Sequence, residues 1–349
     1  MPDLRIAITG ASGLVGSHLS QYLANKRYRV RALVRSLQSA QPFTDSWATF
    51  GIETRQANVL NKDELRQAFT GMDVVIHAAA IVDPYAPSAS IESVNVSGSR
   101  AVLDAARQVG VKQLVFVSSL SVITGNQDQY GSHENSPLLL CGEPYADSKV
   151  QAEKIICANV NDSQTTVTVV RPGFIYGPRE RAWLPQLIQA IAEGRAVLVD
   201  GGSKETNIIY VENLNRAIEA TLLNENAYGQ IYNLTDGQGV TKKHLFDTIS
   251  KELNLPTVQK NLPSWLVKPI FVAVSSVASF LPTPTRKKLA RFSMAAYRLI
   301  GLNQGFSITK AENELGYTKR IPFSAGMAET LHYFKDKAQS LKIKAGNLS

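Results

Sequence analysis

The first 120 residues alternate short apolar runs with amphipathic stretches, and this alternation constrains the fold more than any other feature. The runs at 74–76 and 114–117 are unbroken, as in parallel strands that are covered on both faces. Strand, helix and strand at this spacing predict βαβ units and a doubly wound, Rossmann-type parallel sheet. The pattern predicts strands at 4–9, 28–34, 73–79 and 113–118 and helices at 16–25, 62–69 and 88–109.

The pattern loosens after about residue 178, and the chain has 349 residues, which is enough for about two domains. Beyond that point a helix is predicted at 182–193, a strand that runs into a helix at 208–223 and a strand at 230–234. We therefore expect a Rossmann dinucleotide-binding domain and a smaller, mostly helical substrate-binding domain. The first takes residues 1–178 and about 204–236, the second takes about 179–203 and 237–339, and residues 340–349 form a flexible tail.

A glycine-rich loop at 9–16 follows the first predicted strand and opens the first predicted helix. Gly10 can adopt a tight turn, Gly13 leaves room for a pyrophosphate, and Gly16 lets the helix pack close to the sheet. The N-terminus of that helix offers free N–H groups and a partial positive charge to the phosphates. Because the loop has the strand before it and the helix after it, the spacing predicts a dinucleotide site rather than a chance turn.

The end of the second predicted strand bears on the choice of dinucleotide. A carboxylate at this place binds the ribose 2′-hydroxyl of NAD and repels the 2′-phosphate of NADP. The strand ends in Val34, Arg35 and Ser36, with no acidic residue. Arg35 can pair with a 2′-phosphate, so the sequence favours NADP while NAD stays possible; the alternative is an ordinary surface arginine.

Tyr145 and Lys149 are four residues apart at the start of a predicted helix, so they lie on one helical face. A tyrosine titrates near 10, which is high for proton transfer at neutral pH. A lysine cation one turn away and an oxidised nicotinamide would lower that pKa, and Tyr145 could then exchange a proton with an alcohol or carbonyl oxygen. Ser119 follows a predicted strand and could hold the same oxygen. The Tyr-Lys spacing alone is common, but its combination with the glycine loop predicts a catalytic site.

Six segments follow one another along nearly the whole chain: TGASGLVG at 9–16, DVVIHAAA at 73–80, VNVSG at 94–98, VFVSSLSV at 115–122, YADSK at 145–149 and RPGFIYGP at 171–178. In order and spacing they resemble the extended short-chain dehydrogenases/reductases. YVEN at 210–213, GQIYNLTD at 229–236 and ELGY at 314–317 resemble the 3β-hydroxysteroid dehydrogenase/sterol-4-carboxylate dehydrogenase branch. The resemblance implies a nicotinamide-dependent enzyme that interconverts a secondary alcohol and a ketone.

The resemblance also implies roles for individual residues. Ser119, Tyr145 and Lys149 match the catalytic triad, and Lys149 would also hold the ribose. Asn95 matches an asparagine that ties strand and helix backbones together, and Arg171 is expected to form a structural ion pair. Asn58 stands where the family usually has an aspartate beside the adenine, which removes a charge and keeps an acceptor. The implied cofactor-binding residues are Gly10, Ser12, Gly13, Leu14, Val15, Gly16, Arg35, Asn58, Val59, Ala78, Ala79, Ala80, Tyr145, Lys149 and Pro172.

Three classes of protein remain open. Dehydratases that resemble this family carry acidic residues directly after the active-site hydroxyl, where this chain has Leu120 and Ser121. Related nucleotide-sugar enzymes grip the diphosphate with an arginine, where this chain has Thr206. We therefore expect a bulky apolar substrate that is hydroxysteroid-like or 3-oxo/3-hydroxy acyl-like. A nucleotide-sugar epimerase or reductase is the alternative, and the Tyr-Lys pair argues against a non-catalytic NADP-binding sensor.

An apolar stretch at 269–281 is followed by Arg286-Lys287-Lys288 and by a helix predicted around 289–299. As a helix the stretch reaches about 20 Å, which is too short for a bilayer of about 30 Å. One interpretation is a substrate entrance that touches a membrane, with 269–298 as a peripheral contact and the basic residues meeting anionic lipid. The other is a buried helix of the second domain, which is favoured because short apolar segments more often belong to a core.

Composition excludes several classes of protein. Hydrophobic residues make up 44% and charged residues 19%, which excludes disordered and fibrous chains. The net charge of +8 suits an anionic cofactor, an acidic substrate or a membrane surface, and is too small to indicate nucleic-acid binding alone. Two cysteines and five scattered histidines predict neither a disulfide framework nor a metal site.

No leader sequence and no membrane-spanning run are expected, because the chain enters a predicted strand at once and has no apolar run of about 18 residues. We therefore expect a cytoplasmic enzyme that is in contact with a membrane at most at its periphery. The resemblance implies a homodimer formed through the helix that begins at Tyr145 and the helix around Asn95.

Overall fold

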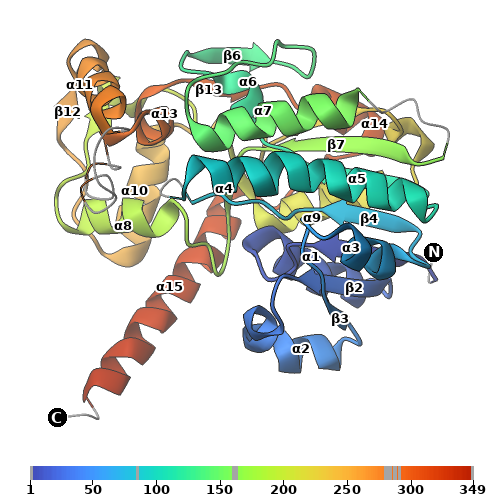
Figure 1. The fold of residues 1–349 in the computed structure, drawn as a ribbon. Coiled ribbons are helices and arrows are strands. Elements are labelled where there is room, and N and C mark those ends of the chain that lie inside the picture. The colour runs from blue at the N-terminus through green and yellow to red at the C-terminus, as the bar shows by residue number, and fades with distance from the viewer. Residues whose placement is uncertain are drawn as a thin grey trace.

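A seven-stranded parallel sheet is the centre of the molecule in the computed structural model, which describes residues 3–83, 86–158, 164–278, 285, 289 and 292–346 (Figure 1). The strands lie in the order β11-β7-β5-β4-β1-β2-β3, and this order reverses between β1 and β4. Dinucleotides bind at such a switch point in parallel sheets. The strands are β1 (Arg5–Thr9), β2 (Arg29–Val34), β3 (Glu53–Gln56), β4 (Val74–His77), β5 (Gln113–Val117), β7 (Thr166–Pro172) and β11 (Ile231–Leu234).

Helices cover both faces of the sheet, which explains why its strands are apolar without interruption (Figure 1). In β1, Ile6 and Ile8 point into one core and Ala7 points into the other. The first core is closed by α1 (Leu14–Asn25), α9 (Val211–Thr221) and α14 (Thr309–Leu315), and the second by α3 (Lys62–Phe69), α5 (Gly98–Gln108) and α7 (Pro144–Cys157). The predicted doubly wound parallel sheet is therefore confirmed.

The helix predicted at 88–109 is interrupted. It consists of α4 (Ser88–Glu92), one turn of π-helix at Ser93–Ser97 and α5. A π-turn places an extra residue in the helical ring, and such turns often occur at functional sites. Periodicity alone does not reveal it, because the apolar face continues on both sides of the turn.

The segment between β2 and β3 has structure that the sequence pattern does not predict. It forms a 3₁₀ helix (Leu37–Phe43) and α2 (Thr44–Thr49), whose Phe43 and Trp47 rings stack at 5.1 Å in the first core. β3 itself is missed because its side chains are mostly polar and exposed. The pattern also omits β7, which lies between β5 and the edge strand β11.

A third core lies beyond the carboxyl edge of the sheet, between helices from the second half of the chain. It is built by α8 (Leu184–Ala192), α10 (Lys242–Leu253) and the first turns of α15 (Phe323–Gly346). Short parallel ladders join it to the rest: β8 (Phe174–Tyr176) with β10 (Ile208–Tyr210), β9 (Leu198–Val199) with β12 (Asn261–Leu262), and β6 (Gln129–Ser132) with β13 (Gln304–Phe306).

The C-terminal segment differs from its prediction. A tail is expected at 340–349, but the backbone of α15 stays helical to Gly346 and projects from the body of the molecule (Figure 1). Phe323, Met327 and Leu331 recur at four-residue spacing and bury the start of this helix in the third core. The helix that begins there continues outward as one element.

The apolar stretch predicted at 269–281 belongs largely to α11 (Ser264–Ala278), which packs against α13 (Met294–Gly301). Val267 and Phe271 are buried, whereas Ile270 and Val277 are at least half exposed. The favoured interpretation of a buried helix is therefore wrong for most of α11, because its apolar residues exceed what one narrow contact with α13 can cover. Residues 279–281 and Arg286–Lys288 lie outside the described residues. Within the described part of the chain, no helix has the length and apolar character needed to cross a bilayer.

Candidate active site

The residues predicted for the site gather at one edge of the sheet. The glycine loop follows β1, Arg35 follows β2, Asn58 and Val59 follow β3, Ala78–Ala80 follow β4, Ser119 follows β5, and Pro172 ends β7. Carboxyl ends of parallel strands share one edge, so this placement results from the topology. Tyr145 and Lys149 come from α7, which crosses the second face of the sheet.

The turn at Gly10 brings two strand ends into contact. Gly10 has a φ of +68°, and a Cβ on it would lie 2.7 Å from Ala79 Cα. Only glycine fits both the conformation and the close approach. Gly16 differs from its prediction: a Cβ there would lie 2.4 Å from Gly10 O, so this glycine lets α1 pack on the loop itself rather than on the sheet.

The first turn of α1 is open to an anion. Gly13 precedes the helix, and no side chain caps it. Gly13 is exposed, and Ser12, Leu14 and Val15 are partly exposed around the same turn. The uncapped N–H groups and the open cradle suit a pyrophosphate, so these residues fit a dinucleotide cofactor.

Arg35 is exposed directly after β2, and among the described residues no hydrogen bond or ion pair engages its guanidinium. Arg31, by contrast, donates from Nε to Glu53 Oε2 at 2.8 Å. The side-chain oxygen of Asn58, which is expected to accept a hydrogen bond from the adenine, already has a partner. Asn58 Oδ1 accepts from Leu60 N at 3.1 Å, so one of its two lone pairs is used. Val59 is buried against Gly98 and fixes the start of α5.

A hydrogen-bond chain through His77 links the glycine loop to the catalytic side of the sheet. Ser99 Oγ donates to Asn95 O at 2.6 Å, so it can accept from His77 Nε2 at 3.0 Å. His77 Nδ1 then accepts from Thr9 Oγ1 at 2.7 Å, and Thr9 accepts from Ala79 N at 3.3 Å. Burial lowers the pKa of His77 to about 3, so the ring is neutral at physiological pH. It can therefore donate from Nε2 and accept at Nδ1 at the same time.

Tyr145 and Ser119 are brought together as predicted. Their side chains share a hydrogen bond at the start of α7, and Ser119 Oγ also accepts from Ser121 N at 3.1 Å. Burial and the Glu143 carboxylate raise the pKa of Tyr145 to about 12, although Ser119 lowers it. The protein's own groups therefore keep this phenol protonated at neutral pH. The predicted lowering depends on Lys149 together with an oxidised nicotinamide, and it stays a prediction.

Lys149 lies one turn further along α7 and is buried. Its Nζ donates to Val117 O at 2.7 Å and lies 4.5 Å from the centre of the Phe116 ring. Burial lowers its pKa to about 8, and Glu153 opposes that shift. The ammonium is held at the end of β5, which explains why it does not counter the raised pKa of Tyr145 in this structure.

The π-turn positions Asn95 below the site. Asn95 Oδ1 accepts from Ile81 N at 2.8 Å, and its Nδ2 donates to Ile81 O at 3.1 Å and to Ser148 Oγ at 2.9 Å. Ser148 in turn donates to Tyr145 O at 2.7 Å. The predicted tie between the segment after β4 and a helix is thus present, and it reaches the backbone of Tyr145.

Arg171 forms the predicted structural ion pair. Its partner is Glu153 of α7, with Arg171 Nε 3.0 Å from Glu153 Oε1, and both side chains are almost fully buried. Ser118 donates a further hydrogen bond to Glu153, and Arg171 Nη1 donates to Glu134 O at 2.9 Å. This pair fixes α7 to β7.

Pro172, the residue that follows Arg171, is the last of β7 and accepts from Leu120 N at 3.0 Å. The ends of β5 and β7 are therefore joined by a direct backbone hydrogen bond. Ser119 lies beside this connection, which holds it next to the predicted nicotinamide side of the site.

Glu143 and Arg298 are missed by the sequence reasoning. Arg298 Nη2 of α13 lies 2.8 Å from Glu143 Oε2, and its Nη1 lies 3.3 Å from Cys141 Sγ. Glu143 stands two residues before Tyr145, so α13 is attached to the N-terminus of the catalytic helix. The two partners are 155 positions apart in the sequence, and no local signal indicates the contact.

A second group of missed residues is polar, buried and unsatisfied. Thr206 Oγ1 and Asn207 Oδ1 have no partner within the described structure, and neither has the amide of Asn233 on β11. Gly173 and Asn207 approach so closely that a Cβ on Gly173 would lie 1.7 Å from Asn207 O. Asn207 therefore stands beside the end of β7.

The YVEN and GQIYNLTD segments hold each other. Asp236 accepts from Tyr176 Oη at 2.7 Å, from Tyr210 N at 2.9 Å and from Asn213 Nδ2 at 2.8 Å. Burial raises the pKa of Asp236, while these donors lower it. The contacts join β8, β10 and the loop after β11, so in this structure the two segments stabilise the fold.

Comparisons with known proteins agree with this geometry. The model of the 3-beta hydroxysteroid dehydrogenase/isomerase family matches residues 7–264. A 4-hydroxy-2-methyl-3-oxo-4-farnesyl-3,4-dihydroquinoline-1-oxide ketoreductase of Stigmatella aurantiaca is 31% identical over 93% of this chain and 95% of its own length. A 3-beta-hydroxysteroid dehydrogenase of Mycolicibacterium neoaurum is 28% identical over 95% and 92%. An N-acetyl-alpha-D-glucosaminyl-diphospho-ditrans,octacis-undecaprenol 4-epimerase of Escherichia coli O157:H7 is 29% identical over 94% of both chains.

Solved structures share the fold. A UDP-glucuronic acid 4-epimerase from Bacillus cereus, in complex with UDP-glucuronic acid and NAD, superimposes with a TM-score of 0.73 and 19% identity over 95% of this chain and 99% of that one. A UDP-glucose 4-epimerase from Thermotoga maritima with UDP-glucose gives a TM-score of 0.73 and 18% identity over 96% and 100%. At these identities the likeness shows the architecture and leaves the substrate open.

Proposed function

Because the chain belongs to the 3-beta hydroxysteroid dehydrogenase/isomerase family of extended short-chain dehydrogenases/reductases, and is thus an NAD(P)-dependent oxidoreductase, we propose that it interconverts a secondary alcohol and a ketone on a bulky apolar substrate. We further propose NADP(H) as its cofactor and Ser119, Tyr145 and Lys149 as its catalytic residues.

One observation carries the catalytic proposal. The Tyr145 hydroxyl is hydrogen-bonded to Ser119, with Lys149 one helical turn away, at the same sheet edge as the open glycine cradle. A ketone oxygen placed between the two hydroxyls would accept hydrogen bonds from both. The nicotinamide cofactor that the glycine cradle would hold would supply a hydride to the carbonyl carbon, so that the protein would have to deliver one proton to the oxygen.

Tyr145 supplies that proton. Its pKa of about 12 keeps the phenol protonated at neutral pH, so it serves as the general acid of reduction. Ser119 holds the substrate oxygen and stabilises negative charge on Tyr145 after proton transfer. Lys149 remains cationic near neutral pH, with a pKa of about 8, and holds the ribose from the end of β5.

The substrate proposal rests on the residues that this chain has where related enzymes bind or react with a sugar diphosphate. Thr206 offers a hydroxyl in place of an arginine, so no bidentate cation is present there for a diphosphate. Leu120 is fully buried and cannot act as an acid or base. One relative named above, the farnesyl-quinoline ketoreductase, acts by name on a molecule with a prenyl chain, which supports an apolar substrate. The undecaprenol-linked epimerase carries both a prenyl chain and a sugar diphosphate in the name of its substrate, so the epimerase remains the alternative.

Turnover of a substrate panel tests the proposal. With NADPH, we expect sterol ketones or long-chain 3-oxo acyl compounds to be reduced and UDP-sugars to be inert. Each methylene that the pocket buries should raise kcat/KM by up to about fourfold, which corresponds to about 0.8 kcal/mol. NADPH absorbance measures reduction. An epimerase returns its hydride and consumes no NADPH, so sugar products are analysed separately; turnover of a sugar diphosphate alone would overturn the proposal.

Cofactor preference is a separate prediction. We expect the unchanged enzyme to favour NADPH over NADH, because Arg35 has no described partner and can pair with the 2′-phosphate. Arg35→Asp should reverse or abolish this preference through charge repulsion. Steady-state kcat/KM with each cofactor measures it, and Arg31→Lys, at an arginine already paired with Glu53, is the matched control. Equal kcat/KM values for both cofactors in the unchanged enzyme would contradict the assignment.

The homodimer through α7 and the helical segment around Asn95 stays a prediction, and so does the cytoplasmic location.

A further inference from the structure

Helix α11 exposes an apolar face that no described part of the chain covers. Half of the twelve large apolar side chains that are exposed in the described structure lie on this helix or directly before it. Leu266, Ile270, Ala273 and Val277 follow one another at helical spacing, with 50% exposure at Ile270 and 56% at Val277. We define the apolar face of α11 as Leu262, Trp265, Leu266, Ile270, Val272, Ala273 and Val277.

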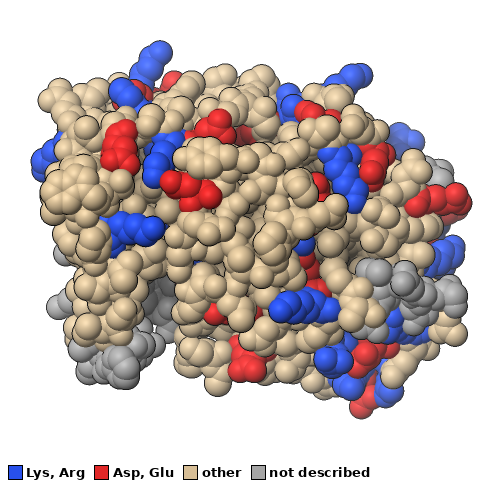
Figure 2. Space-filling model, turned by 90° about the horizontal axis from the view of Figure 1, so that it is seen from above, with Lys and Arg blue, Asp and Glu red and all other residues tan. Residues whose placement is uncertain are grey.

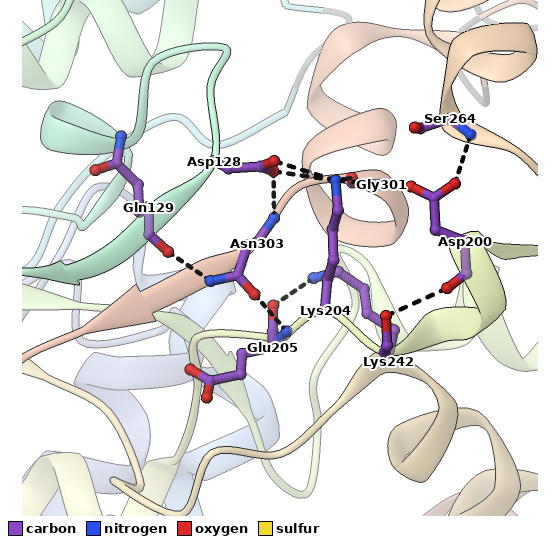
Figure 3. A network of polar contacts seen from close by, with 10 residues as sticks. Asp128, Gln129, Asp200, Lys204, Glu205, Lys242, Ser264, Gly301 and Asn303 are labelled. Carbon is purple, nitrogen blue, oxygen red and sulfur yellow. Dashed lines mark hydrogen bonds and ion pairs between the residues drawn. The ribbon is translucent and has the colours of Figure 1, made fainter.

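The helix is held firmly although this face is free. Phe271 packs against Phe292 and Tyr297, with ring centres 5.8 and 5.5 Å apart. At the start of the helix, Ser264 N donates to Asp200 Oδ1 at 2.8 Å (Figure 3). The exposed side chains therefore belong to an anchored element.

The anchor continues into the body of the protein as a network of polar contacts (Figure 3). Lys204 Nζ lies 3.2 Å from Asp128 Oδ1 and donates to Gly301 O at 3.0 Å. The buried Lys242 Nζ donates to Glu205 O at 2.9 Å, and Asn303 Nδ2 donates to Gln129 O at 2.6 Å. The network joins the loop before β6, the strand β13 and the end of α13 underneath α11.

A groove of about 550 Å³ runs beside the helix. Trp265, Val272 and Leu302 form much of its apolar wall. The charged residues of its lining are Lys268, Lys204 and Asp128, and the last two pair with each other. Trp265 is 74% exposed, the largest value among the apolar residues of α11. An exposed tryptophan beside a lysine is typical of a segment at a membrane interface.

The sequence around this helix is basic, and the exposed Lys260 and Lys268 lie before and on the helix. Arg298 is buried against Glu143, and Lys310 lies on α14. Residues 253–311 contain eight Lys and Arg and no Asp or Glu. The remaining sequence has 29 Lys and Arg and 29 Asp and Glu, so the whole net charge of +8 belongs to this one segment. Figure 2 shows charges of both signs scattered over the upper surface. An apolar face in an all-basic segment is complementary to anionic lipid.

We propose that α11 lies flat on an anionic membrane surface, with its apolar face in the acyl boundary. The helix is 15 residues long, or about 22 Å, and cannot span a bilayer of about 30 Å. A second copy of the chain would bring two basic segments together, and this repulsion favours lipid over self-association.

The docked orientation has a consequence for the enzyme. α11 packs on α13, and Arg298 of α13 binds Glu143, two residues before Tyr145. The membrane would therefore lie on the side of the molecule from which α7 begins. An apolar substrate could enter from the lipid phase; this consequence rests on the proposed function, whereas the docking does not.

Vesicle binding tests the docking with the full chain. We expect co-sedimentation with phosphatidylcholine vesicles that contain about one-third phosphatidylglycerol, and at least about tenfold weaker binding to pure phosphatidylcholine. Raising the salt to about 0.5 M should release much of the protein. On binding, the fluorescence of Trp265 should shift to shorter wavelength. Trp265→Phe should abolish that shift, because the other two tryptophans, the buried Trp47 and the partly buried Trp183, lie outside the apolar face of α11.

Two variants make the test specific. Ile270→Glu combined with Val277→Glu should lower the affinity for anionic vesicles at least about tenfold, because both charges would enter the acyl boundary. Phe50→Glu, at a 41% exposed aromatic after α2, is the control and should bind as the unchanged protein does. Circular dichroism and NADPH binding report whether each variant is folded.

Unchanged vesicle binding of the double variant would overturn the proposal. Equal binding to neutral and anionic vesicles would overturn the role of the basic segment. The lipid assignment is also wrong if the unchanged protein does not bind vesicles and is a dimer while the double variant is a monomer. In that case the apolar face of α11 packs against a second copy of the chain. These readouts measure binding, so a failure of the proposed reaction would leave them unaffected.

Discussion

Tyr145→Phe is expected to lower turnover by about 10²–10⁴-fold while cofactor affinity stays within about twofold, because a general acid contributes about that much to the rate. The phenylalanine ring keeps the packing at the start of α7, and the hydroxyl that is lost is the one bonded to Ser119. The glycine cradle lies on other elements and keeps its geometry.

The measurement combines kcat on a substrate identified by the panel with a direct titration of NADPH binding. Tyr130→Phe is a matched control, because Tyr130 lies on β6 and is 74% exposed. Turnover of Tyr145→Phe within twofold of the unchanged enzyme would remove Tyr145 from the mechanism. A loss of cofactor binding to the same extent as turnover would instead indicate a structural role.

Arg171→Leu is expected to lower the free energy of unfolding by about 3–5 kcal/mol. The change leaves the Glu153 carboxylate buried without its cation, between α7 and β7. The pair is unusually isolated from water, with side-chain exposures of 2% and 1%. Surface ion pairs of this chain, such as Lys243 with Asp247, contribute far less because water screens them.

Urea denaturation measures the loss, and Lys243→Leu serves as the exposed control. The double variant Arg171→Leu with Glu153→Leu should recover about half of the loss or more, because it removes the unpaired charge and leaves two apolar side chains. A single variant as stable as the unchanged protein would show that Glu153 finds another partner or accepts a proton at little cost.

Local chemistry explains what the sequence determined by itself. The glycine loop, the apolar strands and the helical spacing of Tyr145 and Lys149 depend on residues that are close together in the chain. Topology then places every strand end at one edge, so Arg35, Ser119 and Pro172 could be assigned to one site before their distances were known. The ion pair of Arg171 was also predicted, although its partner Glu153 was not.

Elements with mixed polarity could not be predicted in the same way. β3 carries polar side chains at a sheet edge, and the π-turn at Ser93–Ser97 lies within a continuous helical pattern. In both cases the hydrogen bonds that define the backbone are invisible to hydrophobic periodicity. The turn nevertheless matters for the site, because it places Asn95 against Ile81 and Ser148.

Only the tertiary structure decided which surroundings each group receives. The pKa of Tyr145 is raised by the chain's own groups because burial and Glu143 prevail while Lys149 is held at Val117. Arg298 reaches Glu143 from 155 positions away. The apolar run of α11 fits a core and a surface equally well as a sequence, because periodicity shows which side chains share a face and never what covers that face. In the folded chain, contact with α13 buries Val267 and Phe271, whereas the other large apolar side chains of α11 are mostly exposed.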